Sequence, residues 1–281
     1  MRVALTIAGS DSGGGAGIQA DLRTFAAHRL HGASAVTAVT AQNSVAVTAW
    51  TAIAPELVVA QLEAVATDMR VAATKTGMLG NAAVVEAVAA AAGRLALGPL
   101  VVDPVMVAKS GDPLVDRSAQ RAYLELLVPR ATLLTPNLHE AGAFLGRPVR
   151  GLDDMRTAAR DLLSLGAAAV LVKGGALESG EAVDVFCDGR GVVELSGPRI
   201  DTRNVHGAGC TLSAAICARL ALGGEILEAI RGAKAWLTEG LRRSYTVGRG
   251  RGPVNHLHEW DEAAEPGAAA PPRRTLGGGR A

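Results

Sequence analysis

The segment "NVHGAGCTLSAA" (residues 204–215) joins a glycine-rich turn to an apolar stretch of small residues with helical spacing. A turn that enters a helix directs unpaired backbone N–H groups and the positive end of the helix dipole toward one point. The segment therefore predicts an anion site formed by Gly207, Ala208 and Gly209. Cys210 follows directly, and the same field is expected to lower the pKa of its thiol.

Short apolar runs typical of strands alternate with stretches of helical period upstream of this turn. The strand-like runs are "RVALTIA" (2–8), "SAVTAVTAQ" (34–42), "LVVDPV" (100–105), "ATLLTPN" (131–137) and "AAAVLVKGG" (167–175). The clearest helical stretches are "PELVVAQLEAVATDM" (55–69) and "DMRTAARDLLSLG" (154–166). Buried strands between amphipathic helices predict an α/β fold with a mostly parallel central sheet and helices on both faces.

The C-terminal third departs from this alternation. "EAVDVFCDGRGVVELSG" (181–197) predicts an antiparallel hairpin at a sheet edge, because two strand-like runs flank Asp-Gly-Arg-Gly. Two helices are expected to close the domain, at about 209–221 and 225–245. We therefore predict one domain over residues 1–262, followed by a disordered Ala/Gly/Pro/Arg-rich tail over 263–281.

Composition favours a small-molecule partner. The chain has 28 Lys and Arg against 27 Asp and Glu, and aromatic residues make up only 3%, so neither a nucleic-acid surface nor a membrane surface is expected. Three cysteines without CxxC spacing argue against a disulfide framework or a zinc site. The first residues do not predict a secretory signal, so a cytoplasmic location is expected.

Polar residues near the starts and ends of the predicted elements are the candidate ligand contacts, since parallel sheets bind ligands where strands end. In "AGSDSGGGAGIQADL" (8–22), Asp21 either faces back to the glycine loop or is a solvated helix carboxylate. Gln42 offers a donor and an acceptor to a heterocycle edge, or opens a turn with Asn43. Met78, in "KTGMLG" (75–80), suits either the face of a flat ring or the core.

Three further side chains suit phosphate or metal chemistry. Asp103 fits the water shell of a Mg²⁺ ion or a phosphate network better than a helix cap. Lys173 is placed to meet a nucleotide phosphate, or is a surface lysine.

Asn137 and Glu140 share one helix face, either beside a hydrated metal or as a capping box. Among a covalent nucleophile, a redox sensor and a proton acceptor, Cys210 best fits the last, while Cys217 suits a buried helix position.

These segments together resemble the ribokinase superfamily, and more closely its hydroxymethylpyrimidine/phosphomethylpyrimidine kinases of thiamin biosynthesis. The resemblance covers about Val3 to Trp260 and rests on segments that appear in family order. They are "AGSDSGGGAGIQADL", "VTAVTAQNS", "KTGMLG", "VVDPVMVAKSGDPL", "LLTPNLHEA", "VLVKGG", "HGAGCTLSAA" and "GRGPVNHLHEW". Cysteine after the Gly-x-Gly turn marks this branch and some pyridoxal kinases, whereas most ribokinase relatives have aspartate there.

The resemblance implies two successive phosphoryl transfers from ATP with Mg²⁺, first to 4-amino-5-hydroxymethyl-2-methylpyrimidine and then to its monophosphate. It also implies a role for each matching residue, and relatives are often homodimers. Cys210 would be the catalytic base beside the anion hole of Gly207, Ala208 and Gly209. The pyrimidine would contact Gln42, Gly9, Asp21, Met78 and Val105. The nucleotide would contact Asn137, Lys173 and Lys234, and Asp103 and Glu140 would serve the metal.

The chain departs from the family pattern at Ala208, Val205, Ala176, Thr76 and His139. Activity is expected to survive, because backbone N–H groups rather than a threonine hydroxyl form the anion hole. Three alternatives stay open: a pyridoxal kinase, a non-catalytic pyrimidine sensor, and a nicotinamide dehydrogenase, which the absence of an acidic ribose-binding residue disfavours.

Overall fold

The computed structural model describes residues 1–106, 116–177 and 180–260. The predicted tail at 263–281 lies outside these residues, as does the part of "VVDPVMVAKSGDPL" from residue 107 onward. No helix in the described ranges is both long and apolar enough to cross a membrane.

In the described part of the chain, nine strands form one sheet in the order β3-β2-β1-β4-β5-β6-β7-β8-β9. The strands are β1 (Val3–Asp11), β2 (His31–Gln42), β3 (Val47–Ala52), β4 (Val71–Thr76), β5 (Leu100–Val102), β6 (Leu133–Leu134), β7 (Val170–Val172), β8 (Glu181–Cys187) and β9 (Val192–Pro198). The central six strands run parallel, and β8 and β9 form the predicted antiparallel hairpin at one edge. At the other edge, β3 pairs antiparallel with β2, which the sequence patterns did not predict.

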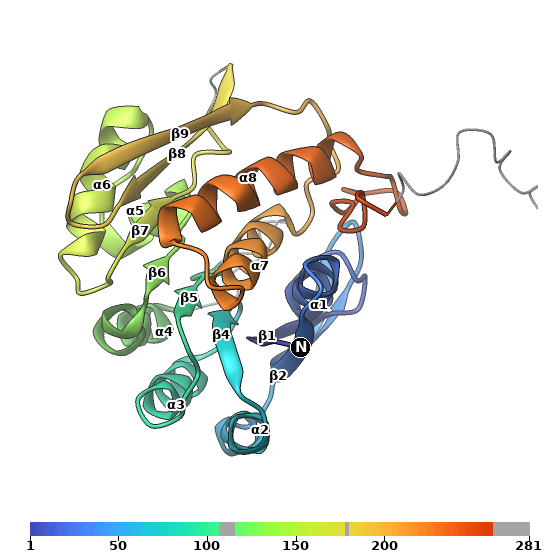
Figure 1. Ribbon diagram of the computed structural model, residues 1–281, viewed down its shortest axis with the longest axis vertical. Helices are drawn as coiled ribbons and strands as arrows, with labels where there is room; N and C mark the ends of the chain where they lie inside the picture. The colour runs from blue at the N-terminus through green and yellow to red at the C-terminus, as the bar shows by residue number, and fades with distance from the viewer. Residues whose placement is uncertain (107–115, 178–179, 261–281) are drawn as a thin grey trace, which may run out of the picture.

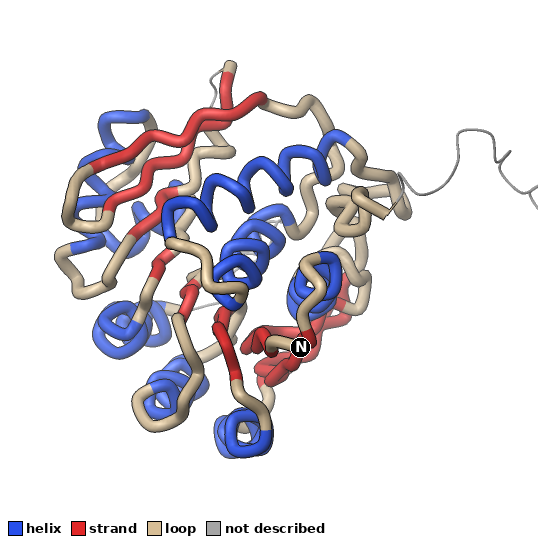
Figure 2. Tube along the Cα trace, viewed as in Figure 1, coloured by secondary structure: helices blue, strands red, loops and turns tan. Residues whose placement is uncertain are grey.

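Helices cover both faces of this sheet (Figures 1 and 2). They are α1 (Gly17–Ala27), α2 (Pro55–Asp68), α3 (Ala82–Ala92), α4 (Arg117–Ala122), α5 (Leu138–Leu145), α6 (Leu152–Leu163), α7 (Ala208–Ala221) and α8 (Ile226–Arg242). A π turn (Tyr123–Leu127) and a 3₁₀ turn (Val128–Arg130) follow α4. The capping carboxylate of α4 is Asp116, which accepts the N–H of Ala119 at 2.9 Å, so Asp103 is not a cap of this helix.

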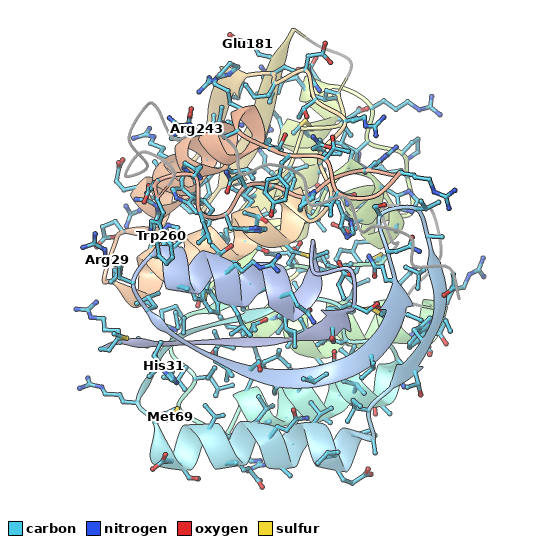
Figure 3. All side chains as sticks on the ribbon, turned by 90° about the vertical axis from the view of Figure 1, so that its right-hand side faces the viewer. Arg29, His31, Met69, Glu181, Arg243 and Trp260 are labelled. Carbon is cyan, nitrogen blue, oxygen red and sulfur yellow. The ribbon has the colours of Figure 1, made fainter. Side chains whose placement is uncertain are left out.

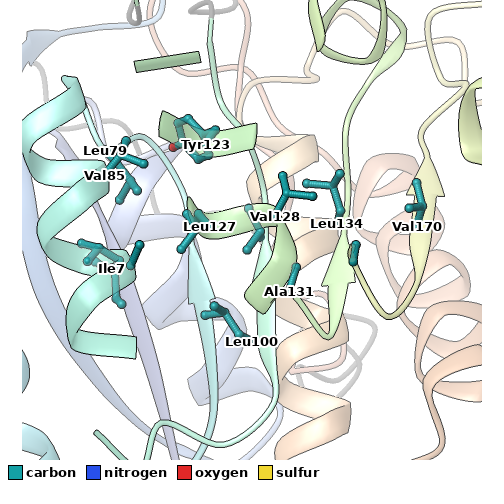
Figure 4. Packing of buried hydrophobic residues seen from close by; sticks show 14 of the residues in the cluster. Ile7, Leu79, Val85, Leu100, Tyr123, Leu127, Val128, Ala131, Leu134 and Val170 are labelled. Carbon is teal, nitrogen blue, oxygen red and sulfur yellow. The ribbon is translucent and has the colours of Figure 1, made fainter. Parts of the chain in front are cut away.

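Two large apolar cores form because the parallel strands other than β2 are largely buried on both faces. One core lies between the sheet and helices α2 to α6, and Figure 4 shows part of it around Ile7, Tyr123 and Leu134. The other holds Phe25, Ile216 and Trp236 between the sheet and helices α1, α7 and α8. Side chains fill both faces in Figure 3, in which α1 lies above the sheet and α2 below it. This layering brings the carboxyl ends of β1, β4, β5 and β7 together with the start of α7.

Candidate active site

A cavity of about 160 Å³ lies where those strand ends meet the start of α7. Most of the residues predicted from the sequence line it together, although they come from seven separate segments. They are Gly9, Gln42, Met78, Asp103, Val105, Asn137, Glu140, Lys173, Gly207, Ala208, Gly209 and Cys210. Lys234 and Asp21 do not line this cavity.

The glycine turn before α7 depends on backbone geometry that only glycine accepts at one position. Gly207 has φ +75°, and a Cβ placed on it would lie 1.9 Å from the carbonyl oxygen of Gly15. Helix α7 begins at the next residue, so the N–H groups of its first turn have no partner within the helix. Ala208 uses its N–H in a turn to Val205 O at 3.2 Å, and Gly209 and Cys210 follow it at the cavity wall. The turn has the form of an anion site.

The sequence predicted a lowered pKa for Cys210, and this prediction is wrong. Burial raises the pKa of this thiol to about 11, and the carboxylates of Asp21 and Asp103 raise it further, while Lys75 and the Gly17 N–H act in the opposite direction. The helix terminus alone therefore does not make a thiolate, because loss of solvent and nearby negative charge outweigh it. At neutral pH Cys210 is therefore a thiol.

A buried ion pair lies behind the cysteine. Asp21 is fully buried on α1, and its carboxylate accepts from Lys75 Nζ at 2.9 and 2.8 Å and from Thr6 Oγ1 at 2.6 Å. Lys75, at the end of β4, is fully buried and lines the cavity. The prediction that Asp21 is a solvated helix carboxylate is thus wrong. Asp21 is linked to the cavity through its ion pair with Lys75. Although burial opposes its charge, Asp21 raises the pKa of Lys75, so a permanent cation lies beside Cys210.

A second pair, formed by Asp103 and Lys173, lies on the other side of the cavity. Lys173 Nζ donates to Asp103 Oδ1 at 2.7 Å, and Ser213 Oγ of α7 donates to Oδ2 at 2.9 Å. Thr135 Oγ1 adds a longer contact of 3.3 Å to Oδ1. Burial lowers the pKa of Lys173, but Asp103 and Glu140 more than offset it, so the pKa is raised and the ammonium group stays charged. Lys173 is not a surface lysine, since only 11% of its side chain is exposed.

Asn137 and Glu140 form a capping box, which was one of the two roles predicted for this pair from the sequence. Asn137 Oδ1 accepts the N–H of Glu140 at 2.9 Å, and Glu140 Oε2 accepts the N–H of Asn137 at 2.8 Å. The box starts α5, and both residues also face the cavity, so the structural and functional roles are compatible. Burial raises the pKa of Glu140 to about 7, with Lys173 opposing and nearby Asp103 adding to the shift.

This raised pKa predicts a pH-dependent stability. Because the folded pKa of about 7 exceeds the ordinary glutamate value of 4.5, the folded state binds more protons than the unfolded state between these values. Stability from this group is complete below the unfolded pKa and is lost as pH rises through the folded one. Urea unfolding at several pH values should therefore show that Glu140→Gln loses less stability than the wild type from acidic to neutral pH. Parallel stability curves would contradict the assignment.

The end of the cavity near Gly9 and Gln42 has an apolar wall and a polar wall. Met78 and Val105 pack together with Ala38, and a Cβ on Gly9 would lie 3.3 Å from Met78 Sδ. Opposite, Gln42 Nε2 lies 3.3 Å from His206 Nε2, which is 2.9 Å from Asp11 Oδ2.

The Asp11 carboxylate fixes this polar wall. Although burial opposes it, hydrogen bonds from His206, Ala16 and Gly13 lower the pKa of Asp11, so the residue is an anion that orients the imidazole. Sequence reasoning missed Asp11, and the signal available was a carboxylate directly ahead of the three-glycine loop.

A larger groove of about 970 Å³ adjoins the cavity and shares Asn137, Lys173, Ala208 and Gly209 with it. Lys234 lines this groove, where its Nζ donates to Asp184 Oδ2 at 2.6 Å and to Ala182 O at 2.9 Å. Size and position suit a nucleotide whose terminal phosphate reaches Lys173 and the glycine turn. A phosphate contact for Lys234 stays a prediction.

Comparisons with known proteins identify the family. Residues 11–255 match the phosphomethylpyrimidine kinase family. The chain belongs to this family. It is 49% identical to the hydroxymethylpyrimidine/phosphomethylpyrimidine kinase of Rhizobium meliloti, with 92% of this chain and 98% of the relative covered. The corresponding protein of Escherichia coli is 45% identical over the same shares. The resemblance seen in the sequence is confirmed, as is kinase activity on hydroxymethylpyrimidine and its monophosphate in thiamin biosynthesis.

Solved structures confirm the ribokinase-like fold. An ADP complex of Bacillus subtilis pyridoxal kinase superimposes with a TM-score of 0.87 at 40% identity and covers 92% of this chain and 99% of its own. The phosphomethylpyrimidine kinase of Clostridium difficile gives a TM-score of 0.76 at 39% identity and covers 85% and 99%. Nucleotide complexes among these relatives agree with ATP as the phosphoryl donor.

Proposed function

We propose that this kinase binds the pyrimidine ring between Gln42 and the wall of Met78 and Val105, with its hydroxymethyl group directed at Cys210. The observation that carries the proposal is one cavity lined by Gln42, Lys173, Cys210 and the glycine turn. ATP lies in the adjoining groove, and its terminal phosphate meets Lys173 and the N–H groups at the start of α7. This arrangement aligns acceptor oxygen and donor phosphorus, which is the main requirement of phosphoryl transfer.

In the first transfer the alcohol oxygen forms a bond to the terminal phosphorus while the bond to the ADP oxygen breaks. The alcohol proton goes to Cys210 Sγ, and Lys75 beside it stabilises the thiolate that accepts this proton. In the second transfer a phosphate oxygen of the monophosphate attacks the same position on a second ATP. That oxygen is already deprotonated at neutral pH, so this step needs no base.

The residues lining the cavity suit a Mg²⁺ ion, although they do not form a complete metal-binding cluster by themselves. Within the described ranges no three His, Cys, Asp or Glu residues are placed to hold a metal by themselves. Asp103 and Glu140 nevertheless put two buried carboxylates on one cavity, and Mg²⁺ is usually bound by one or two carboxylates with water and substrate phosphates. We assign these two residues to its water shell, where the ion would neutralise charge on the transferred phosphoryl group.

We also propose that the protein forms a homodimer and is located in the cytoplasm. A homodimer is supported by Val39 and Trp50, large apolar side chains of β2 and β3 that are 47% and 40% exposed. Location in the cytoplasm fits a biosynthetic enzyme with three free cysteines.

A coupled assay of ADP release with the pyrimidine alcohol, followed by mass analysis, tests the proposed function directly. We expect the monophosphate to appear first and the diphosphate to follow. Pyridoxal belongs in the same assay because the fold is so similar to that of Bacillus subtilis pyridoxal kinase. Turnover of pyridoxal alone would favour that activity instead, and absence of ADP release with every acceptor would favour a non-catalytic sensor.

Replacing Gln42 by alanine is expected to raise KM for the pyrimidine about tenfold, since one hydrogen bond to a bound ligand is worth about 1.5 kcal/mol. KM for ATP should change little, because Gln42 lines the cavity and not the nucleotide groove. Steady-state kinetics with each substrate varied in turn measures both constants. A raised KM for ATP with an unchanged KM for the pyrimidine would overturn the pocket assignment.

A further inference from the structure

A second pocket, of about 420 Å³, adjoins the pyrimidine side of the active-site cavity and shares Gln42 and His206 with it. Arg203, Arg249 and Arg251 line this pocket, together with residues 42–47 and Gly250. We call it the arginine pocket. No aspartate or glutamate is among its lining residues, so its wall carries a formal charge of +3 from the three guanidinium groups.

Hydrogen bonds hold together the three segments that line the pocket, two of which carry the arginines. Gly250 N donates to Ser44 Oγ at 3.1 Å and Arg251 N donates to Ser44 O at 3.0 Å, which fixes the segment after α8 on the turn between β2 and β3. Gly252 N donates to Asn204 Oδ1 at 3.0 Å, and His206 N donates to Gly252 O at 3.0 Å. Arg203, directly before Asn204, is thereby tied to the same segment. The pocket is a built feature of the fold.

Within the described residues, the three guanidinium groups have no internal partner. Over the described part of the chain none of them forms an ion pair or a side-chain hydrogen bond, and all three residues are exposed. Asp201, two residues from Arg203, is also exposed and forms no ion pair with them. Nearby Asp11 is already occupied by His206 and three backbone N–H groups. Converging unpaired guanidinium groups are the chemistry that recognises phosphate.

We propose that the arginine pocket attracts the phosphorylated pyrimidine to the active site and so favours the monophosphate over the uncharged alcohol. The proposal rests on the activity with both acceptors. During turnover the phosphate of the monophosphate must lie near the glycine turn, where it reacts with ATP. The arginine pocket therefore acts while the monophosphate approaches the active site, and it does not hold the phosphate during the reaction. Charged walls at the mouth of a cleft raise association rates in this way, by about 10-fold or more, and salt suppresses the effect.

The two acceptors provide an internal control, because they differ only in the phosphate group. At saturating ATP, kcat/KM for each would be measured from about 0.01 M salt, where the Debye length is about 30 Å, to about 1 M, where it is about 3 Å. We expect kcat/KM for the monophosphate to fall about tenfold over this range and that for the alcohol to change little.

Variants then assign the effect to the pocket. Replacing the three arginines together by glutamine should lower kcat/KM for the monophosphate about tenfold at low salt and remove its salt dependence, with the alcohol reaction unchanged. Replacement by lysine should keep most of the salt dependence. Arg70→Gln is a matched control, since this exposed arginine directly precedes β4, at the end of the sheet where the parallel strands begin. His31 and Met69 mark this end of the sheet in Figure 3.

Three results would overturn the proposal. They are an equal loss for both acceptors in the glutamine variant, no loss for either, or the same loss in Arg70→Gln. If the wild-type enzyme turned over neither acceptor, the proposed function itself would be wrong. This outcome can be told apart from the three results that contradict the arginine pocket alone.

Discussion

Lys173→Met is expected to lower kcat about 10³-fold with both acceptors, because it removes the cation placed where charge develops on the transferred phosphoryl group. Lys173 lines both the cavity and the adjoining groove, so it lies at the junction of the proposed acceptor and donor sites. The buried ammonium group is charged at all working pH values, and its only described hydrogen bond is to Asp103. Steady-state kinetics with the alcohol and the monophosphate measures the loss.

This variant also leaves the Asp103 carboxylate buried without its cation, at a cost in stability of about 3–5 kcal/mol. Lys173→Met combined with Asp103→Asn removes both charges and keeps the hydrogen bonds of Ser213 and Thr135 within reach. We expect urea unfolding of the double variant to recover much of the lost stability while kcat stays low. Recovery of kcat together with stability would show that Lys173 acts only on the fold.

Cys210→Ala is expected to lower kcat for the alcohol about 10²–10⁴-fold, the usual loss when a general base is removed, with KM nearly kept. The loss for the monophosphate should be much smaller, because its attacking oxygen carries no proton at neutral pH. Cys217→Ala is the matched control, since Cys217 lies on the same helix but is fully buried away from the cavity. Single-turnover kinetics with each acceptor separates the two steps. Turnover of the alcohol by Cys210→Ala at the wild-type rate would exclude the base assignment.

Much of the fold was predictable because it depends on local patterns. Apolar runs between amphipathic helices predicted the parallel sheet, and Asp-Gly-Arg-Gly at 188–191 predicted the hairpin of β8 and β9. Strand β3 was missed because its residues are mostly exposed and its pairing with β2 is what makes it a strand. Strand β4 was missed because Lys75 interrupts its apolar run, although the lysine is buried.

The candidate site was predictable as a set of residues but not as an electrostatic environment. Motifs placed Gln42, Lys173 and Cys210 at segment ends, and the parallel topology brings such ends together. The Asp21–Lys75 pair joins residues far apart in the chain, so no local pattern reveals it. The pKa of Cys210 depends on that pair, on Asp103 and on burial, whereas the sequence shows only the helix terminus. Among the site residues that the sequence did not predict, Lys75 has the largest consequence, because it lies beside Cys210 and affects the pKa of its thiol.

The pH dependence of kcat/KM for the alcohol, compared between the wild type and Cys210→Ala, tests the central claim that this sulfur takes the alcohol proton. Above about pH 8 Glu140, with a pKa of about 7, is already ionised, whereas Cys210, with a pKa of about 11, is still mostly a thiol. The fraction of thiolate, and with it kcat/KM of the wild type, should therefore rise about tenfold per pH unit toward pH 10. Cys210→Ala should lose this rise. Parallel profiles for the two enzymes would contradict the account.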